Sequence, residues 1–120
     1  MVVRVPEPKA VVPFVFFGDT KYALVMEHIS GLTLGEYVAG KSRLPLPVWE
    51  QLDESIDKLK KAGFVIIDNA LSRNVLVSEG VLFFVDPEAY KSSAQLSWFA
   101  RCGYRARTSV ELAYYHTLVK

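Results

Sequence analysis

Hydrophobic residues in the first ninety positions fall mostly into short runs that are separated by turn-forming residues. Phe14–Phe17 and Tyr22–Ile29 flank the segment Gly18-Asp19-Thr20-Lys21, a pattern that predicts a β-hairpin around a Gly-Asp turn. Three more apolar runs predict strands: Phe64–Ile67, Val75–Val77 and Val81–Val85. The last two are joined by Ser78-Glu79-Gly80 and predict a second hairpin. The chain therefore contains several short strands, each bounded by polar or glycine-containing turns.

The period changes to that of a helix between Val48 and Ala62. Apolar residues recur there at steps of three and four: Trp49, Leu52, Ile56 and Leu59. Gly63 follows as a candidate C-cap. Pro47 suits a first helical position. A shorter helix is predicted before it, because Thr33 and Glu36 have the spacing of a capping box and Gly40 is a natural stop.

Two further helices are predicted near the end of the chain, at about Ser93–Arg101 and Ser109–Val119, the second with Thr108 and Glu111 as its capping box. The order of elements (hairpin, helices, short strands, helices) predicts an α+β fold. We expect one domain over residues 1–120. Its parts would be an extended N-terminal arm (1–12), a central region with the hairpins and the long helix (13–90), and a basic helical tail (91–120).

Composition narrows the class of protein. The 120 residues include 14 Lys and Arg against 13 Asp and Glu, so no strong net charge favours nucleic acid or anionic lipid. The single cysteine, Cys102, excludes an intramolecular disulfide framework. One cysteine and two separated histidines also argue against a zinc site. No apolar run is long enough to span a membrane, which predicts a cytoplasmic protein. The scarcity of Asn and Gln, two of each, is a weak indication of a thermophilic source.

The segment from Lys60 to Tyr90 contains the candidate chemistry. A long helix leads into a polar loop with Asp68, Asn69 and Asn74, and the following hairpin ends at Asp86. A carboxylate and an amide oxygen, with positions left for water and phosphate, are typical ligands of Mg²⁺. The segment therefore offers donors that suit a magnesium site, without a choice among them at this point.

Two stretches, Gly63–Val77 (GFVIIDNALSRNVLV) and Leu82–Asp86 (LFFVD), resemble the catalytic loop and the metal-binding aspartate of protein-kinase-like enzymes. Upstream, Tyr22–Leu34 (YALVMEHISGLTL) resembles their hinge. The likeness is strongest to the small atypical kinases, the RIO kinases and the kinase subunit of the KEOPS complex, and it covers Val12 to Tyr90. It implies the C-terminal lobe of a kinase with the hinge strands attached.

The resemblance also assigns roles to single residues. Met26 would be the gatekeeper, and the backbone of Glu27 and Ile29 would bind adenine. Asn74 and Asp86 would hold the Mg²⁺ of a bound ATP. Counting from Gly63 places the catalytic aspartate at Asp68, whereas counting from Asn74 places it at Asn69; Asp68 is preferred because the role needs a carboxylate.

The sequence departs from the kinase pattern in ways that leave the activity open. Ile66-Ile67 replace the usual His-Arg pair before the catalytic aspartate, Pro87-Glu88 replace the usual Phe-Gly, and no phosphate-binding loop precedes the hinge. One hypothesis is a serine/threonine-type or atypical kinase, an ATP- and Mg²⁺-dependent phosphotransferase. The alternative is a pseudokinase, an inactive kinase-like interaction module. Both predict a homo-oligomer or a protein partner over the face left by the missing lobe.

Each candidate also has a purely structural interpretation. Asp86 could simply end a strand before a proline, and Asn74 could bridge backbone groups in a loop. The basic and aromatic tail, with Arg101, Arg105 and Trp98 among its residues, fits a solvated helix face better than an RNA-binding surface. Nucleic acid and membrane partners are therefore not expected.

Overall fold

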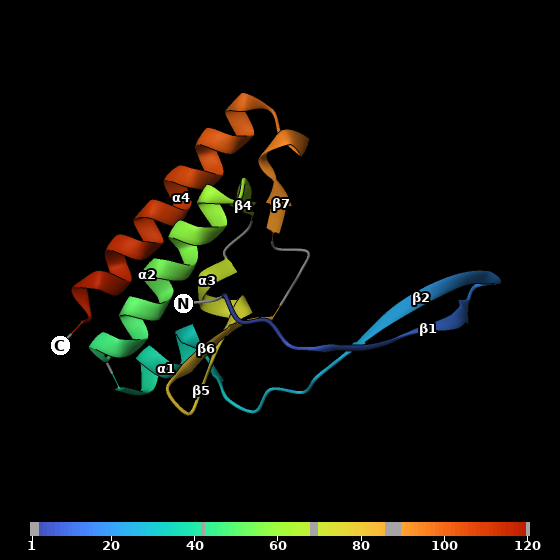
Figure 1. Cartoon of the computed structure of the whole chain (residues 1–120), viewed down its shortest axis with the longest axis horizontal. Helices are drawn as coiled ribbons and strands as arrows, with labels where there is room; N and C mark the ends of the chain where they lie inside the picture. Colours follow the sequence, from blue (N-terminus) through green and yellow to red (C-terminus); the bar gives the residue numbers. More distant parts are fainter. Residues whose placement is uncertain (1–2, 42, 68–69, 86–89, 120) are drawn as a thin grey trace.

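The structure is a computed structural model that describes residues 3–41, 43–67, 70–85 and 90–119. A long hairpin projects from a body of helices and short strands (Figure 1). The hairpin consists of β1 (Pro8–Phe16) and β2 (Asp19–Met26). The body follows in chain order: β3 (Leu32–Thr33), α1 (Leu34–Lys41), α2 (Leu46–Lys61), β4 (Phe64–Ile66), α3 (Ala70–Asn74), β5 (Val75–Ser78), β6 (Val81–Phe84), β7 (Tyr90–Ser92), the 3₁₀ turn η2 (Ser93–Gln95) and α4 (Trp98–Thr117). The fold is thus a mixture of helices and small sheets.

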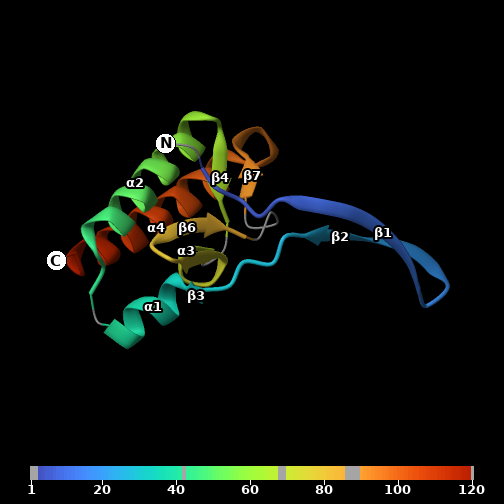
Figure 2. The same ribbon diagram turned by 60° about the horizontal axis from the view of Figure 1, so that its bottom comes forward.

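The predicted first hairpin is confirmed, and it is longer than its apolar run. Its turn is Phe17-Gly18, where both residues have positive φ (50° and 80°), so the turn lies one residue earlier than the Gly-Asp pair. The second half of the N-terminal arm belongs to β1, which is extended as expected. The hairpin stands away from the helices in a second view as well (Figure 2), and the molecule measures 52 Å along its longest axis.

The capping box that begins α1 is formed as predicted. The Thr33 hydroxyl accepts from the Glu36 N–H, and the Glu36 carboxylate accepts from the Thr33 N–H, both at 3.2 Å. These hydrogen bonds lower the pKa of the Glu36 carboxyl. Gly40 does not stop the helix, which continues to Lys41.

The long helix α2 is confirmed; of its predicted stripe, Leu52 and Ile56 are buried and Trp49 and Leu59 are half-buried. Val48, Leu52 and Ile56 lie in the core, and Gly63 follows the helix at a φ of 86°, a value that favours glycine. On its other side Gln51 binds the β5–β6 turn. Its amide donates to the Gly80 carbonyl at 2.8 Å and accepts from the Leu82 N–H at 3.1 Å.

Three small antiparallel sheets are present in the described part of the chain: β1–β2, β3–β5–β6 and β4–β7. The second predicted hairpin corresponds to β5–β6 and is confirmed, with Val75 opposite Phe84. The segment expected to be a polar loop contains the short helix α3.

The prediction of two helices at the end of the chain is wrong. A single helix, α4, runs from Trp98 to Thr117, so Thr108 and Glu111 lie inside it and do not form a cap. Ser97 is the N-cap, and its side chain accepts from the Ala100 N–H. Gly103 lies inside this helix, where its low helix propensity costs only about 1 kcal/mol and does not end it.

The core lies where α2 and α4 cover the β3–β5–β6 sheet. It includes Leu34, Leu52, Leu71 and Val75, each fully buried, together with Tyr115 of α4. Among the described residues no helix is long and apolar enough to cross a membrane.

Candidate functional site: the hinge and the end of the β5–β6 hairpin

One predicted magnesium ligand, Asn74, lies at the open end of the β5–β6 hairpin. Asn74 is the last residue of α3 and is half-buried. Its carbonyl accepts the Val85 N–H at 2.9 Å. Val85 directly precedes Asp86 in the sequence, so Asn74 lies across the hairpin from the residue next to Asp86.

Three predicted site residues fall outside the described part of the chain. They are the two candidates for the catalytic position, Asp68 and Asn69, and the metal candidate Asp86. Within the described residues, no group of three or more His, Cys, Asp or Glu side chains is placed to hold a metal ion. The choice between Asp68 and Asn69 therefore stays open.

The predicted hinge leaves the hairpin at the end of β2. Met26 is half-buried, Glu27 is exposed, and Ile29 lies half-buried in the link to β3. The Glu27 N–H donates to the Glu7 carbonyl at 2.7 Å, and the Glu7 N–H donates to the Glu27 carboxylate at 3.3 Å. The Glu27 carbonyl and the Ile29 N–H have no hydrogen-bond partner among the described residues, so both are available to a ligand.

The N-terminal arm connects the hinge to the β5–β6 hairpin. The Arg4 carbonyl accepts from the Phe84 N–H at 2.9 Å, which adds the arm to the free edge of β6. Pro6 is buried beside it, and Glu7 then binds Glu27 as described above. The hinge and the end of β6 are thus held in one local arrangement by residues 4–7.

An apolar cavity of about 360 Å³ lies at this junction. It is bordered by residues from the arm, the hairpin base, α2, β4, β6 and β7: Val5, Pro6, Pro8, Leu24, Met26, Leu59, Phe64, Phe84 and Tyr90. The rings of Phe84 and Tyr90 pack edge to face with their centroids 5.9 Å apart. Met26 and Phe84 therefore border one space, which places the hinge next to the strand that leads to Asp86.

Helix α4 supports the segment that carries Asn74. The Tyr115 hydroxyl and the Ser72 hydroxyl of α3 lie 2.5 Å apart and share a hydrogen bond. Burial raises the pKa of the Tyr115 phenol, so it is neutral near pH 7. The Glu111 carboxylate accepts the Leu71 N–H, and burial nevertheless raises the pKa of Glu111. These contacts fix α3 against α4 and so orient Asn74.

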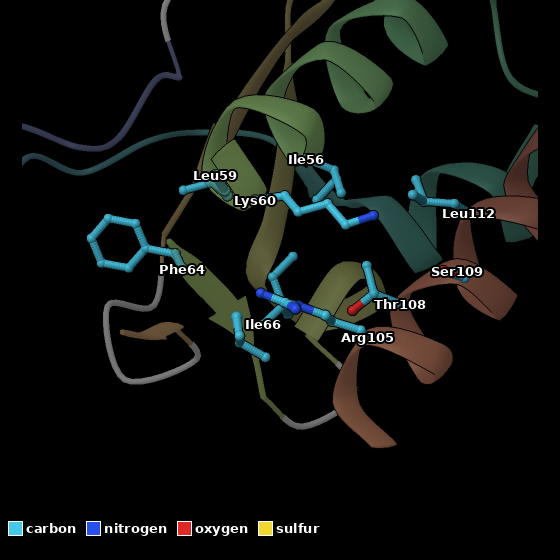
Figure 3. A pocket seen from close by; sticks show the side chains of 10 residues that line it. Ile56, Leu59, Lys60, Phe64, Ile66, Arg105, Thr108, Ser109 and Leu112 are labelled. Carbon is cyan, nitrogen blue, oxygen red and sulfur yellow. The ribbon is translucent and has the colours of Figure 1, made fainter. Parts of the chain in front are cut away.

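A second, smaller cavity of about 50 Å³ lies between α2, β4 and α4 (Figure 3). Its floor is apolar, with Ile56, Ile66 and Leu112. Lys60 reaches toward it from α2 and Arg105 from α4. It is too small for a nucleotide and lacks the predicted site residues.

The aromatic residues of the tail are divided between surface and core. Trp98 and Phe99 are 66% and 82% exposed at the start of α4, whereas Tyr115 is buried, as its predicted packing role requires. Cys102 is exposed. The half-buried Arg101 and the exposed Arg105 occupy the same helix, which leaves the tail a mixed basic and apolar surface.

Several residues of the site were missed by sequence reasoning. Glu7 was not singled out, and Glu111 was assigned to a capping box. Leu59, Phe64 and Phe84 have only the pattern of core residues, because nothing local distinguishes a cavity wall from a packed core. No sequence signal identifies the Ser72–Tyr115 pair, whose members are 43 positions apart.

Comparison of the chain with protein-family models, with curated proteins and with solved structures gives no match.

Proposed function

We propose that this chain is the nucleotide-binding part of an ATP- and Mg²⁺-dependent phosphotransferase of the protein-kinase-like type. The observation that carries the proposal is the 2.9 Å hydrogen bond from the Val85 N–H to the Asn74 carbonyl, because Val85 directly precedes Asp86 in the sequence. An amide oxygen and a carboxylate suit Mg²⁺, which prefers few protein ligands and completes its shell with water and phosphate. The donor set therefore fits the ion that the resemblance implies.

The hinge supports the adenine half of the proposal. The Glu27 carbonyl and the Ile29 N–H, unpaired among the described residues, offer one acceptor and one donor on the two peptide groups that flank His28, which suits the edge of a purine base. Met26 borders an apolar cavity behind them. Residues 4–7 bind both the hinge and β6, so the hinge backbone keeps a fixed separation from β6.

Each chain residue has a defined task in this proposal. Asn74 and Asp86 would hold the metal ion, which neutralises phosphate charge when the nucleotide is bound. Asp68 would orient the acceptor hydroxyl and take its proton. Ser72, Tyr115 and Glu111 would act indirectly, as positioning residues for the segment that ends at Asn74.

The inactive kinase-like module is the second candidate. It is favoured by the long apolar surface of the hairpin, which a catalytic role does not explain. The two candidates differ in turnover: the enzyme transfers phosphate from ATP and loses this activity in Asp68→Asn, whereas the module has no activity to lose.

Nucleotide binding is tested by thermal unfolding of the full chain with ATP, in the presence and absence of Mg²⁺. A ligand at 100 times its dissociation constant adds about 2.7 kcal/mol to the free energy of unfolding. We expect a Mg²⁺-dependent rise of the melting temperature that is lost in Asn74→Ala and Asp86→Ala. Asp53→Ala, an exposed acid on α2, is the matched control and should retain it. No stabilisation at millimolar ATP would refute the proposal.

A further inference from the structure

Two cationic side chains cross the small cavity between α2, β4 and α4 from opposite sides (Figure 3). Lys60 extends from α2 toward α4, and Arg105 extends from α4 toward β4. Both cations are exposed, whereas Ile56 and Ile66 in the lining are buried. The cavity therefore combines an apolar floor with a rim that carries two positive charges.

These two charges are not neutralised within the described part of the chain. Neither Lys60 nor Arg105 has an ion pair there, and Asp57, one turn before Lys60, binds Lys61 instead at 2.8 Å. The residues three and four positions to either side of Arg105 include no acid: Arg101, Cys102, Thr108 and Ser109. Like charges that face one space repel each other, and an anion between them removes the repulsion. The rim therefore suits a negatively charged ligand.

Helix electrostatics explain only one of the two cations. Lys60 lies in the last turn of α2 with Lys58 and Lys61, where the helix dipole stabilises positive charge. Arg105 lies in the middle of α4, away from either end of that helix, so the dipole does not account for it. Its guanidinium lies over the cavity, where it can donate hydrogen bonds to a ligand in this space.

The wall of the cavity on α4 adds hydroxyl groups, from Thr108 and Ser109. The Thr108 hydroxyl points toward Arg105 (Figure 3), and it has no hydrogen-bond partner among the described residues. The volume of about 50 Å³ has room for roughly four water-sized atoms. A ligand of about four to six heavy atoms therefore fills the cavity with its polar end at the rim.

We propose that this cavity binds a short aliphatic carboxylate, with its charged end between Lys60 and Arg105 and its alkyl group on the apolar floor. The carboxylate accepts hydrogen bonds from the guanidinium and from the Thr108 hydroxyl. Inorganic phosphate suits the cavity less, because some of its oxygens would face the apolar floor without a hydrogen-bond partner. The inference concerns a different cavity from the proposed nucleotide site and does not depend on that site.

A nuclear magnetic resonance titration of the ¹⁵N-labelled full chain with isobutyrate, at constant ionic strength and without ATP, tests this proposal. We expect saturable shifts of the Ile66 and Thr108 amide signals. Isobutyramide has the same shape without the charge, so it should bind at least about tenfold more weakly. Inorganic phosphate should also bind more weakly than isobutyrate, because it has no alkyl group to bury.

A pair of arginine variants on α4 locates the site. Arg105→Gln removes a charged hydrogen-bond donor and should raise the dissociation constant of isobutyrate at least about tenfold. Arg107→Gln is the matched control, because Arg107 is equally exposed on α4 and does not line the cavity; it should leave the constant unchanged. Circular dichroism checks that both variants remain folded.

Four results would each overturn the proposal. They are the absence of saturable shifts, equal binding of isobutyrate and isobutyramide, phosphate binding as tight as that of isobutyrate, and equal effects of the two arginine variants. The comparison of isobutyrate with isobutyramide uses the unmodified chain, so it decides the matter even if Arg105→Gln fails to fold.

Discussion

Gly31 lies between the hinge and β3, and its replacement by alanine should push β3 away from β5. A Cβ atom at this position would lie 2.4 Å from the Val77 carbonyl oxygen and 3.3 Å from the Ser78 Cα. These are backbone atoms of β5, so no side-chain rotation can relieve the clash. The strand β3, which pairs Leu32 with Val77, must move away by about 1 Å to restore ordinary contact.

The expected cost follows from what β3 loses when it moves. Its pairing with β5 comprises two residue pairs, and each lost hydrogen bond costs about 1 kcal/mol. Overpacking of a close contact adds strain of similar size, so Gly31→Ala should lower the free energy of unfolding by about 2–3 kcal/mol. For a domain of this length that is a fall in melting temperature of roughly 10 °C. Urea denaturation followed by circular dichroism measures the free energy directly.

Gly40→Ala is the matched control for this prediction. Gly40 lies in the last turn of α1, and a Cβ there meets no atom within 4 Å. Alanine favours the helix over glycine, so this variant should gain about 0.5 kcal/mol. A Gly31→Ala variant as stable as the wild type would refute the close approach of the hinge to β5.

Three other predictions concern the supports of the site. Tyr115→Phe should cost about 1 kcal/mol in urea denaturation, and a double-mutant cycle with Ser72→Ala should show coupling because the two hydroxyls share one bond; additive effects would contradict the contact. The pKa of Glu111 is raised in the folded state, so its contribution to stability is present below the unfolded pKa of 4.5 and is lost as the pH rises through the folded value. Glu111→Gln should therefore flatten the plot of melting temperature against pH above 4.5. An unchanged profile would disprove this. Thr33→Ala removes the α1 cap and should cost about 1 kcal/mol, whereas no loss of stability would show that the cap is unimportant.

Local signals predicted much of the fold. The helix α2, the capping box at Thr33 and the existence of both hairpins depend on neighbours within a few positions, and the structure contains them, with the first turn one residue earlier than predicted. The end of the chain was predicted less well. The Thr108–Glu111 spacing matches a capping box, yet both residues lie inside α4, which runs on to Thr117.

The arrangement of the site could not be read from the sequence. The hydrogen bond between Asn74 and Val85 follows from hairpin register and could be anticipated, because both residues flank the β5–β6 strands. The contact of Glu7 with Glu27 and the contact of Ser72 with Tyr115 join residues 20 and 43 positions apart. Such pairs depend on how elements pack, which no local pattern encodes.

The most direct test of the proposed site is a nuclear magnetic resonance titration of the ¹⁵N-labelled chain with ATP and Mn²⁺ in place of Mg²⁺. Paramagnetic broadening depends on distance from the metal ion, so it locates the ion without any mutation. We predict loss of the Asn74 and Val85 amide signals and a shift of the Ile29 amide, with Ala100 on α4 unchanged. Broadening centred on Lys60 and Arg105, or no specific broadening, would contradict a nucleotide-metal site at the end of the β5–β6 hairpin.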